Sequence, residues 1–78
     1  MKSLKAVNFK LLVKVFETEG FVCVREEGDH MMFVKPGVLR PVVIPKYFAV
    51  PVFIIKNNLR TAGISRERYF ELLSKKIK

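Results

Sequence analysis

The single histidine of the chain, His30, is the side chain best suited to move protons near neutral pH. It follows Glu27, Gly28 and Asp29, a run typical of an exposed turn that opens a strand. There an imidazole can take the proton of a ribose 2′-hydroxyl while that oxygen attacks the adjacent phosphate and cations stabilise the phosphoryl oxygens. A lone histidine is more often a bystander, so the residues alone leave both interpretations open.

Cations for such chemistry are concentrated in the second part of the sequence. Residues 1–29 carry five bases and five acids, whereas residues 30–78 carry ten bases and two acids and therefore the whole net charge of +8. This asymmetry predicts a polyanionic partner, with nucleic acid first and an anionic membrane second; a surface that only confers solubility is the alternative. Lys35, Arg40 and Lys46 are the candidate phosphate-binding residues, unless they lie on a solvated edge.

Other catalytic and metal-binding patterns are absent from the sequence. It contains no glycine-rich phosphate loop, HExxH pair, carboxylate metal cluster or nucleophile elbow, and one histidine with one cysteine cannot form a four-ligand zinc site. We therefore expect no metal and no cofactor. Cys23 is flanked by apolar residues and is interpreted as a small hydrophobe in a strand, which favours a reducing, cytoplasmic compartment.

The length of 78 residues predicts one domain, residues 1–78, with a thin core. A chain that is half hydrophobic has ample surface to bury, which excludes disorder. The longest uninterrupted apolar run, 49–55, is far shorter than the roughly 20 residues of a membrane span. The first residues also lack the pattern of a signal peptide. The sequence thus predicts a soluble protein with no membrane partner.

Hydrophobic periodicity and turn residues predict an α+β domain. Apolar residues recur at helical spacing after Asn8, a good N-cap, and stop at Gly20. Short β-branched and aromatic runs with tight turns favour a three-stranded antiparallel sheet, in which Pro41 confines the third strand to an edge or a later start. Ser65 is the predicted N-cap of a short last helix with a basic end at 75–78. The predicted elements are a helix, three strands, a helix and the short helix, over 8–19, 21–26, 30–35, 40–44, 52–62 and from residue 65.

More apolar surface is predicted than one small domain can bury. The three strands are apolar on both faces, although an antiparallel sheet with helices on one side should alternate. The segment 48–55 is almost wholly apolar as well. Such a surplus usually marks a protein interface, so we expect a partner, or a second copy in a homo-oligomer, to cover the free sheet face or this segment. The candidate interface residues are Phe48, Val50, Val52 and Phe53.

Several short motifs follow one another in a fixed order. They are Gly20-Phe21, Arg25, Gly28-Asp29-His30, Phe33, Ile44-Pro45 and Leu59-Arg60-Thr61-Ala62-Gly63-Ile64-Ser65. Together they resemble the HicA (YcfA-like) toxin family, small mRNA interferases paired with HicB antitoxins, over about residues 8–73. The resemblance implies an α-β-β-β-α fold like that of double-stranded-RNA-binding domains. It also implies metal-independent RNA cleavage with His30 as the catalytic residue, presented by a turn of Gly28 and Asp29.

Three positions near this turn depart from the family pattern. Asp29 stands where the family usually has Ser, Met31 replaces a frequent second histidine, and Tyr47 stands where a histidine often follows the Val-Pro step. The resemblance favours an RNA-cleaving toxin, an endoribonuclease of a type II toxin–antitoxin pair, with mRNA and a HicB-like antitoxin as partners. Two alternatives are a non-catalytic RNA-binding module of the same fold and a protein-interaction domain whose basic charge is incidental.

Overall fold

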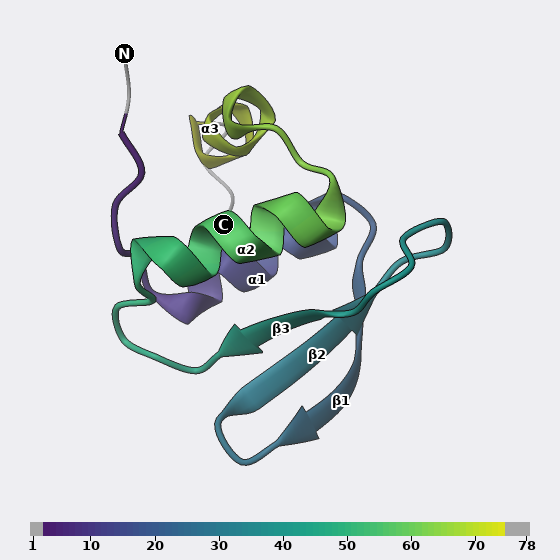
Figure 1. Ribbon diagram of the computed structural model, residues 1–78. Coiled ribbons are helices and arrows are strands. Elements are labelled where there is room, and N and C mark those ends of the chain that lie inside the picture. The colour runs from purple at the N-terminus through teal and green to yellow at the C-terminus, as the bar shows by residue number, and fades with distance from the viewer. Residues whose placement is uncertain (1–2, 75–78) are drawn as a thin grey trace.

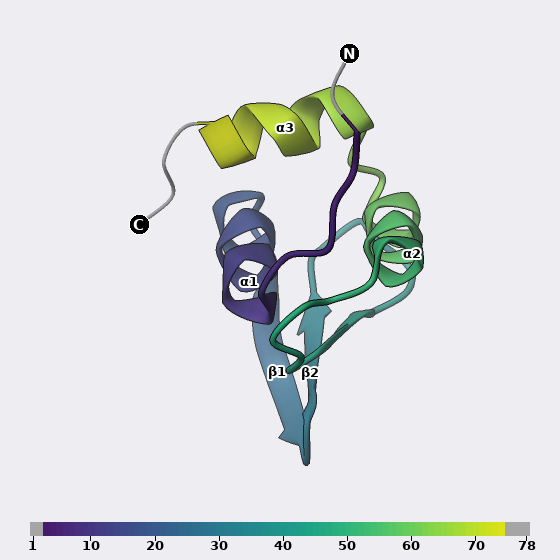
Figure 2. The ribbon, with the colours of Figure 1, turned by 90° about the vertical axis from the view of Figure 1, so that its left-hand side faces the viewer.

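The computed structural model describes residues 3–74. Its elements in chain order are α1 (Phe9–Thr18), β1 (Val22–Glu27), β2 (His30–Val34), β3 (Val42–Pro45), α2 (Val52–Ala62) and α3 (Arg66–Ser74). The strands form one open antiparallel sheet in the order β1-β2-β3. Helices α1 and α2 lie side by side on one face of the sheet, and α3 lies across them (Figure 1, Figure 2). The predicted α+β class and the α-β-β-β-α layout are confirmed, while the predicted basic end at 75–78 lies outside the described residues.

Helix α1 begins where the sequence predicts. The Asn8 Oδ1 atom accepts a hydrogen bond from the Lys10 backbone N–H at 2.9 Å, which satisfies one free donor of the first turn. Leu12 and Phe16 are fully buried on the side of the helix that faces the core. After the helix, Gly20 takes a φ of +96°, which a residue without a Cβ adopts at little cost, and the chain turns into β1.

The register of the sheet determines which residues surround His30. In the β1–β2 hairpin, Glu27 lies opposite His30, and a bulge interrupts the pairing just before Arg25. On the other side of β2, Pro45 lies opposite His30. β3 is therefore an edge strand and starts after Pro41, as predicted, because a proline has no N–H for the ladder.

One face of the sheet packs against the helices and the other stays open. Phe33, Val42 and Ile44 are buried on the inner face, whereas Val22 and Val24 of β1 are 60% and 57% exposed. The prediction that both faces of the sheet carry apolar residues is thus partly confirmed, because the open face exposes these valines to solvent. The buried apolar side chains are Leu12, Val15, Phe16, Phe21, Phe33, Val42, Ile44, Val50, Ile55, Leu59, Tyr69 and Leu72.

Helix α3 is held by buried side chains and by an ion pair to the end of α1. Tyr69 and Leu72 are buried in the common core. The Ser65 Oγ atom accepts a hydrogen bond from the Arg68 backbone N–H at 3.0 Å, which confirms the predicted N-cap. The Arg68 guanidinium donates to Glu19 Oε2 from Nε at 3.0 Å and from Nη2 at 2.7 Å, and this bond raises the pKa of Arg68. The two helices are therefore joined by charge as well as by packing.

The apolar segment before α2 is divided between the core and the surface. Val50 is fully buried, and its N–H donates to the Val7 carbonyl at 2.7 Å in an isolated antiparallel bridge. It belongs to the core and cannot present its side chain to a partner, contrary to the sequence-based expectation. Phe48 and Phe53 are 87% and 66% exposed, and Val52 is half-buried. The apolar surface in this segment therefore consists mainly of two phenylalanines.

Candidate functional site

Residues 28 and 29 form a tight turn at the tip of the β1–β2 hairpin, which extends beyond the helices (Figure 1, Figure 2). Gly28 has a φ of +54°, in the left-handed region that favours glycine. The Lys46 backbone N–H donates to the Asp29 carbonyl at 2.6 Å and ties this turn to the end of β3. The start of β2 is therefore held from both neighbouring strands.

His30 is the first residue of β2, and its side chain lies on the open face of the sheet, 53% exposed. The Nδ1 atom lies 2.9 Å from Oδ1 of Asp29, so this ring nitrogen is occupied by the neighbouring carboxylate. The Nε2 atom is then the nitrogen that can exchange a proton with a ligand on the open face. This arrangement suits general acid–base catalysis.

A shallow hollow of about 40 Å³ beside His30 is lined by Arg25, Glu27, Met32 and Val43. The Arg25 guanidinium lies 2.7 Å from Glu27 Oε2 in this hollow. Sequence reasoning did not place Arg25 among the phosphate-binding candidates. The two-residue turn is the signal that could have found it, because this turn pairs residue 27 with residue 30 and so places residue 25 on the same face.

Of the three predicted phosphate-binding residues, only Lys46 lies at the His30 end of the sheet. Lys35 follows the opposite end of β2, roughly 16 Å away at about 3.3 Å per residue. Its ammonium group lies 5.7 Å from the centroid of the Phe21 ring. Arg40 precedes the corresponding end of β3 and lines a groove beside α2. The predicted cations are thus divided between the two ends of the sheet.

Residues 3–74 hold neither a cluster of metal ligands nor a membrane-spanning helix. Within that range, no three or more His, Cys, Asp or Glu side chains gather where they could hold a metal ion. No helix there has the length and apolar character needed to cross a membrane. The chemistry that the hairpin itself can supply is proton transfer and charge stabilisation.

Comparison with known proteins places the chain in a family. A family model described as "HicA toxin of bacterial toxin-antitoxin" matches residues 9–64. The chain belongs to the HicA toxin family. No curated protein and no solved structure matches it. The part of this HicA family member that matches runs from α1 through α2 and includes the hairpin with His30, and family membership gives the protein a toxin role in a toxin–antitoxin pair.

The two cations at the His30 end of the sheet of this HicA family member, Arg25 and Lys46, are each held by a carboxylate. Arg25 is paired with Glu27, Lys46 is paired with Glu26, and Asp29 adds a third carboxylate. Surface ion pairs contribute only about 0.2–1 kcal/mol each, so a phosphate can replace these carboxylates at small cost. The field at the hairpin is nevertheless less positive than the net charge of the chain suggests.

Proposed function

We propose that this toxin is an mRNA interferase, a metal-independent endoribonuclease that uses His30 and acts in the cytoplasm. The observation that carries the proposal is the half-exposed imidazole at the hairpin tip, with Nδ1 2.9 Å from Asp29 Oδ1 and Nε2 available on the open face. A three-stranded antiparallel sheet with helices on one face resembles the layout of double-stranded-RNA-binding domains. Such folds recognise RNA by shape and phosphate contacts.

The reaction that this geometry supports is an internal transfer of the phosphodiester. The His30 Nε2 atom takes the proton from a ribose 2′-hydroxyl, and the 2′-oxygen attacks the adjacent phosphorus. The bond from phosphorus to the 5′-oxygen breaks, that oxygen takes up a proton from water, and the His30 imidazolium returns its proton to the solvent. The products are a 2′,3′-cyclic phosphate and a 5′-hydroxyl, so no external nucleophile or metal ion enters the balance.

Arg25 and Lys46 are the side chains placed to stabilise the charge that develops on the phosphoryl oxygens. Arg25 lines the hollow beside His30, whereas Lys46 lies at the same end of the sheet, and each exchanges its carboxylate partner for phosphate when RNA binds. A planar guanidinium such as that of Arg25 can contact two phosphate oxygens at once. Asp29 acts as a positioning residue through its bond to the ring.

The proposal is tested by incubating the purified protein with single-stranded RNA in the presence of EDTA. Cleavage to products with 2′,3′-cyclic phosphate ends is expected, and His30→Ala should abolish it while the circular dichroism spectrum stays that of the wild type. Lys10→Ala, on the exposed side of α1, is the matched control and should cleave normally. Cleavage that survives in His30→Ala removes this residue from the mechanism.

A non-catalytic RNA-binding module is the second candidate, and the carboxylates of Asp29 and Glu27 beside the imidazole favour it. They oppose the approach of a phosphate to His30 and leave room for RNA binding elsewhere on the basic surface. This alternative predicts RNA that stays intact and a binding constant that falls steeply with salt, as counterion release requires. Product analysis on one gel separates it from the first candidate.

We further propose that a HicB-like antitoxin covers Phe48 and Phe53 together with half-buried Val52. Phe48 lies just before α2 and Phe53 lies in the first turn of that helix. Two exposed phenylalanines so close in the chain are unusual on a small monomer and typical of a protein interface. A second copy of the chain is the alternative occupant. Size-exclusion chromatography of the protein alone and with a co-expressed antitoxin distinguishes the two, because only a homo-oligomer elutes early without the antitoxin.

A further inference from the structure

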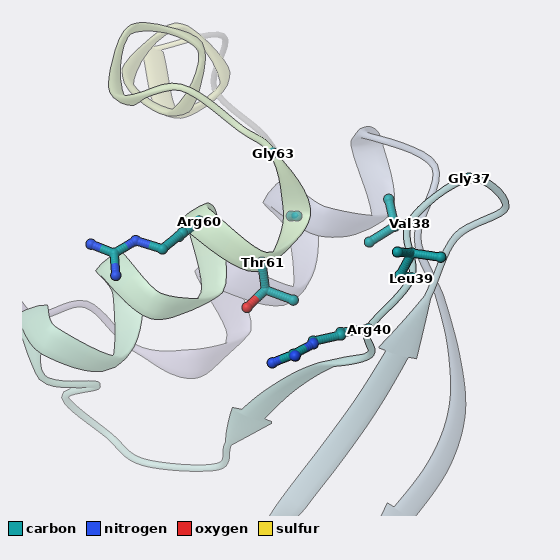
Figure 3. Close-up of a pocket in the computed structure, with 8 residues that line it drawn as sticks. Gly37, Val38, Leu39, Arg40, Arg60, Thr61 and Gly63 are labelled. Carbon is teal, nitrogen blue, oxygen red and sulfur yellow. The ribbon is translucent and has the colours of Figure 1, made fainter.

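Four cationic side chains around α2 form no ion pair or hydrogen bond with any residue in the described range 3–74. They are Arg40, Lys56, Arg60 and Arg66. They line two grooves, of about 370 Å³ and about 310 Å³, and Arg60 lines both. In Figure 3, Arg40 extends from the chain just before β3 and lies beneath the end of α2, where the Thr61 side chain points towards it. Arg60 projects from another side of the same helix. The two grooves therefore form one basic track around α2.

The basic track differs from the hairpin in its electrostatics. The cations beside His30 are paired with carboxylates, whereas no Asp or Glu of residues 3–74 lines either groove. Unpaired guanidinium groups keep all their donors for a ligand and lose no protein partner when they bind one. A group of four unneutralised cations thus lies away from the residue proposed to do chemistry.

We infer that the basic track binds the sugar–phosphate backbone of RNA at phosphates that flank the one being cleaved. The inference rests on the proposed function in taking RNA as the ligand. Phosphate is the anion that fits the donor set, because arginine guanidinium groups contact phosphate oxygens in pairs and the Thr61 hydroxyl can donate a further bond. An irregular groove lined by backbone and side chains of several elements also suits a strand bound without reading its bases.

The path between the track and His30 follows β3. Arg40 lies just before this strand, and Pro45 at its end is paired with His30, so the two sites are separated by roughly 16 Å at about 3.3 Å per residue. β3 is an edge strand, and no further strand covers its outer side in the described residues. An RNA strand can therefore run along this edge, but only an RNA longer than a dinucleotide reaches both sites.

The experiment measures how cleavage and binding depend on RNA length. The wild type is compared with Arg40→Gln/Arg60→Gln and with the control Lys10→Gln/Lys5→Gln, which removes the same charge from positions outside both grooves. For the wild type and the control, KM should fall as the RNA grows from two to about twelve nucleotides. In the groove variant, Arg40→Gln/Arg60→Gln, KM should fall much less as the RNA grows longer.

Binding is measured on the same variants in a His30→Ala background, so that the RNA stays intact. The plot of log affinity against log salt concentration should become shallower by about 0.7 for each phosphate that the protein no longer neutralises, and so by about 1.4 in the groove variant. An equal length dependence and an equal salt slope in the groove and control variants overturn the inference. It is also overturned if the groove variant loses only its affinity for the antitoxin, because the track would then bind an acidic protein.

Failure of the proposed function is distinguishable from failure of this inference. If the wild type binds RNA through the basic track but leaves it intact, the catalytic proposal is refuted and the inference about RNA binding stands. If the wild type cleaves RNA while the groove variant behaves as the control, the inference about RNA binding is refuted and the catalytic proposal stands. If the wild type neither binds nor cleaves RNA, both are refuted.

Discussion

The Nδ1 atom of His30 and the Oδ1 atom of Asp29 lie 2.9 Å apart at the tip of the hairpin, and both side chains are more than half exposed. The carboxylate has two opposed effects on an RNA substrate. It orients the ring so that Nε2 faces the ligand, and its negative charge opposes the approach of a phosphate. These effects separate in the kinetic constants, because orientation acts on kcat and repulsion of the substrate raises KM.

Asp29→Ala should lower kcat by up to about fivefold, because an exposed pair of this kind is worth about 0.2–1 kcal/mol. It should also lower KM, since the repulsive charge is gone. Asp29→Asn keeps an oxygen that accepts from Nδ1–H, so its kcat should exceed that of Asp29→Ala at a similarly low KM. Steady-state kinetics on a short labelled RNA measure both constants. If kcat is the same in the two variants and the wild type, Asp29 does not position the ring.

Glu27→Gln should increase the affinity for RNA, because it releases Arg25 from its 2.7 Å ion pair on the face that His30 occupies. We expect KM to fall by roughly two- to fivefold, the range that corresponds to one surface ion pair. Glu17→Gln on the exposed side of α1 removes the same charge far from the hairpin and is the control. An equal fall of KM in the two variants would mean that net charge alone, and not the freed guanidinium, attracts the RNA.

The fold could be predicted from the sequence because its local signals agree with one another. Asn8 and Ser65 cap helices as expected, and Gly20 ends the first helix region with a positive φ. The third strand starts later than its apolar run because Pro41 cannot donate to the ladder. Local chemistry thus sets the boundaries, and the tight turns leave an antiparallel sheet as the simplest topology.

The surroundings of His30 could be predicted only in part, because an extended strand places residues that are close in sequence far apart in space. Lys35 is close to His30 in the chain but lies at the other end of β2, while Arg25 returns beside it through the hairpin. The burial of Val50 depends on a bridge to Val7 at the other end of α1, a long-range pairing that no local pattern reveals. Contacts of this kind are decided by tertiary packing.

Tyr69→Phe should raise the free energy of unfolding by about 1 kcal/mol. The Tyr69 side chain is 1% exposed, and its hydroxyl has no hydrogen-bond partner among residues 3–74. A buried polar group without a partner costs about 1–3 kcal/mol, and phenylalanine removes it with little change of shape. Urea denaturation at pH 7 measures the difference, with Tyr47→Phe, which is 40% exposed, as the control. A destabilised Tyr69→Phe protein would show that the hydroxyl is satisfied in solution.

Tyr69 should also make the protein less stable at high pH. Burial raises the pKa of its hydroxyl above the ordinary value of 10.0, so between the two pKa values the unfolded chain binds fewer protons than the folded one. Stability is then fully present below about pH 10 and is lost as the pH rises through the folded-state pKa. Denaturation curves recorded across this range should show a loss in the wild type that is smaller in Tyr69→Phe. Parallel losses in the two proteins would assign the alkaline transition to other groups.

Substitutions of Phe48 and Val50 distinguish an exposed residue from a core residue within the apolar segment before α2. Val50→Ala should lower the free energy of unfolding by about 2 kcal/mol, because its buried side chain leaves a cavity, and should bind the antitoxin normally while folded. Phe48→Ala removes an 87% exposed ring, so its stability should stay within about 0.5 kcal/mol of the wild type.

The affinity for the antitoxin should show the reverse order. Loss of an aromatic anchor costs about 2 kcal/mol or more, so Phe48→Ala and Phe53→Ala should each raise the Kd by roughly thirtyfold, as isothermal titration calorimetry would measure. Wild-type antitoxin affinity in both phenylalanine variants would contradict the proposed interface. In that case the exposed valines of β1 on the open sheet face would be the next apolar surface to test for the partner, since Val50 is enclosed by the core.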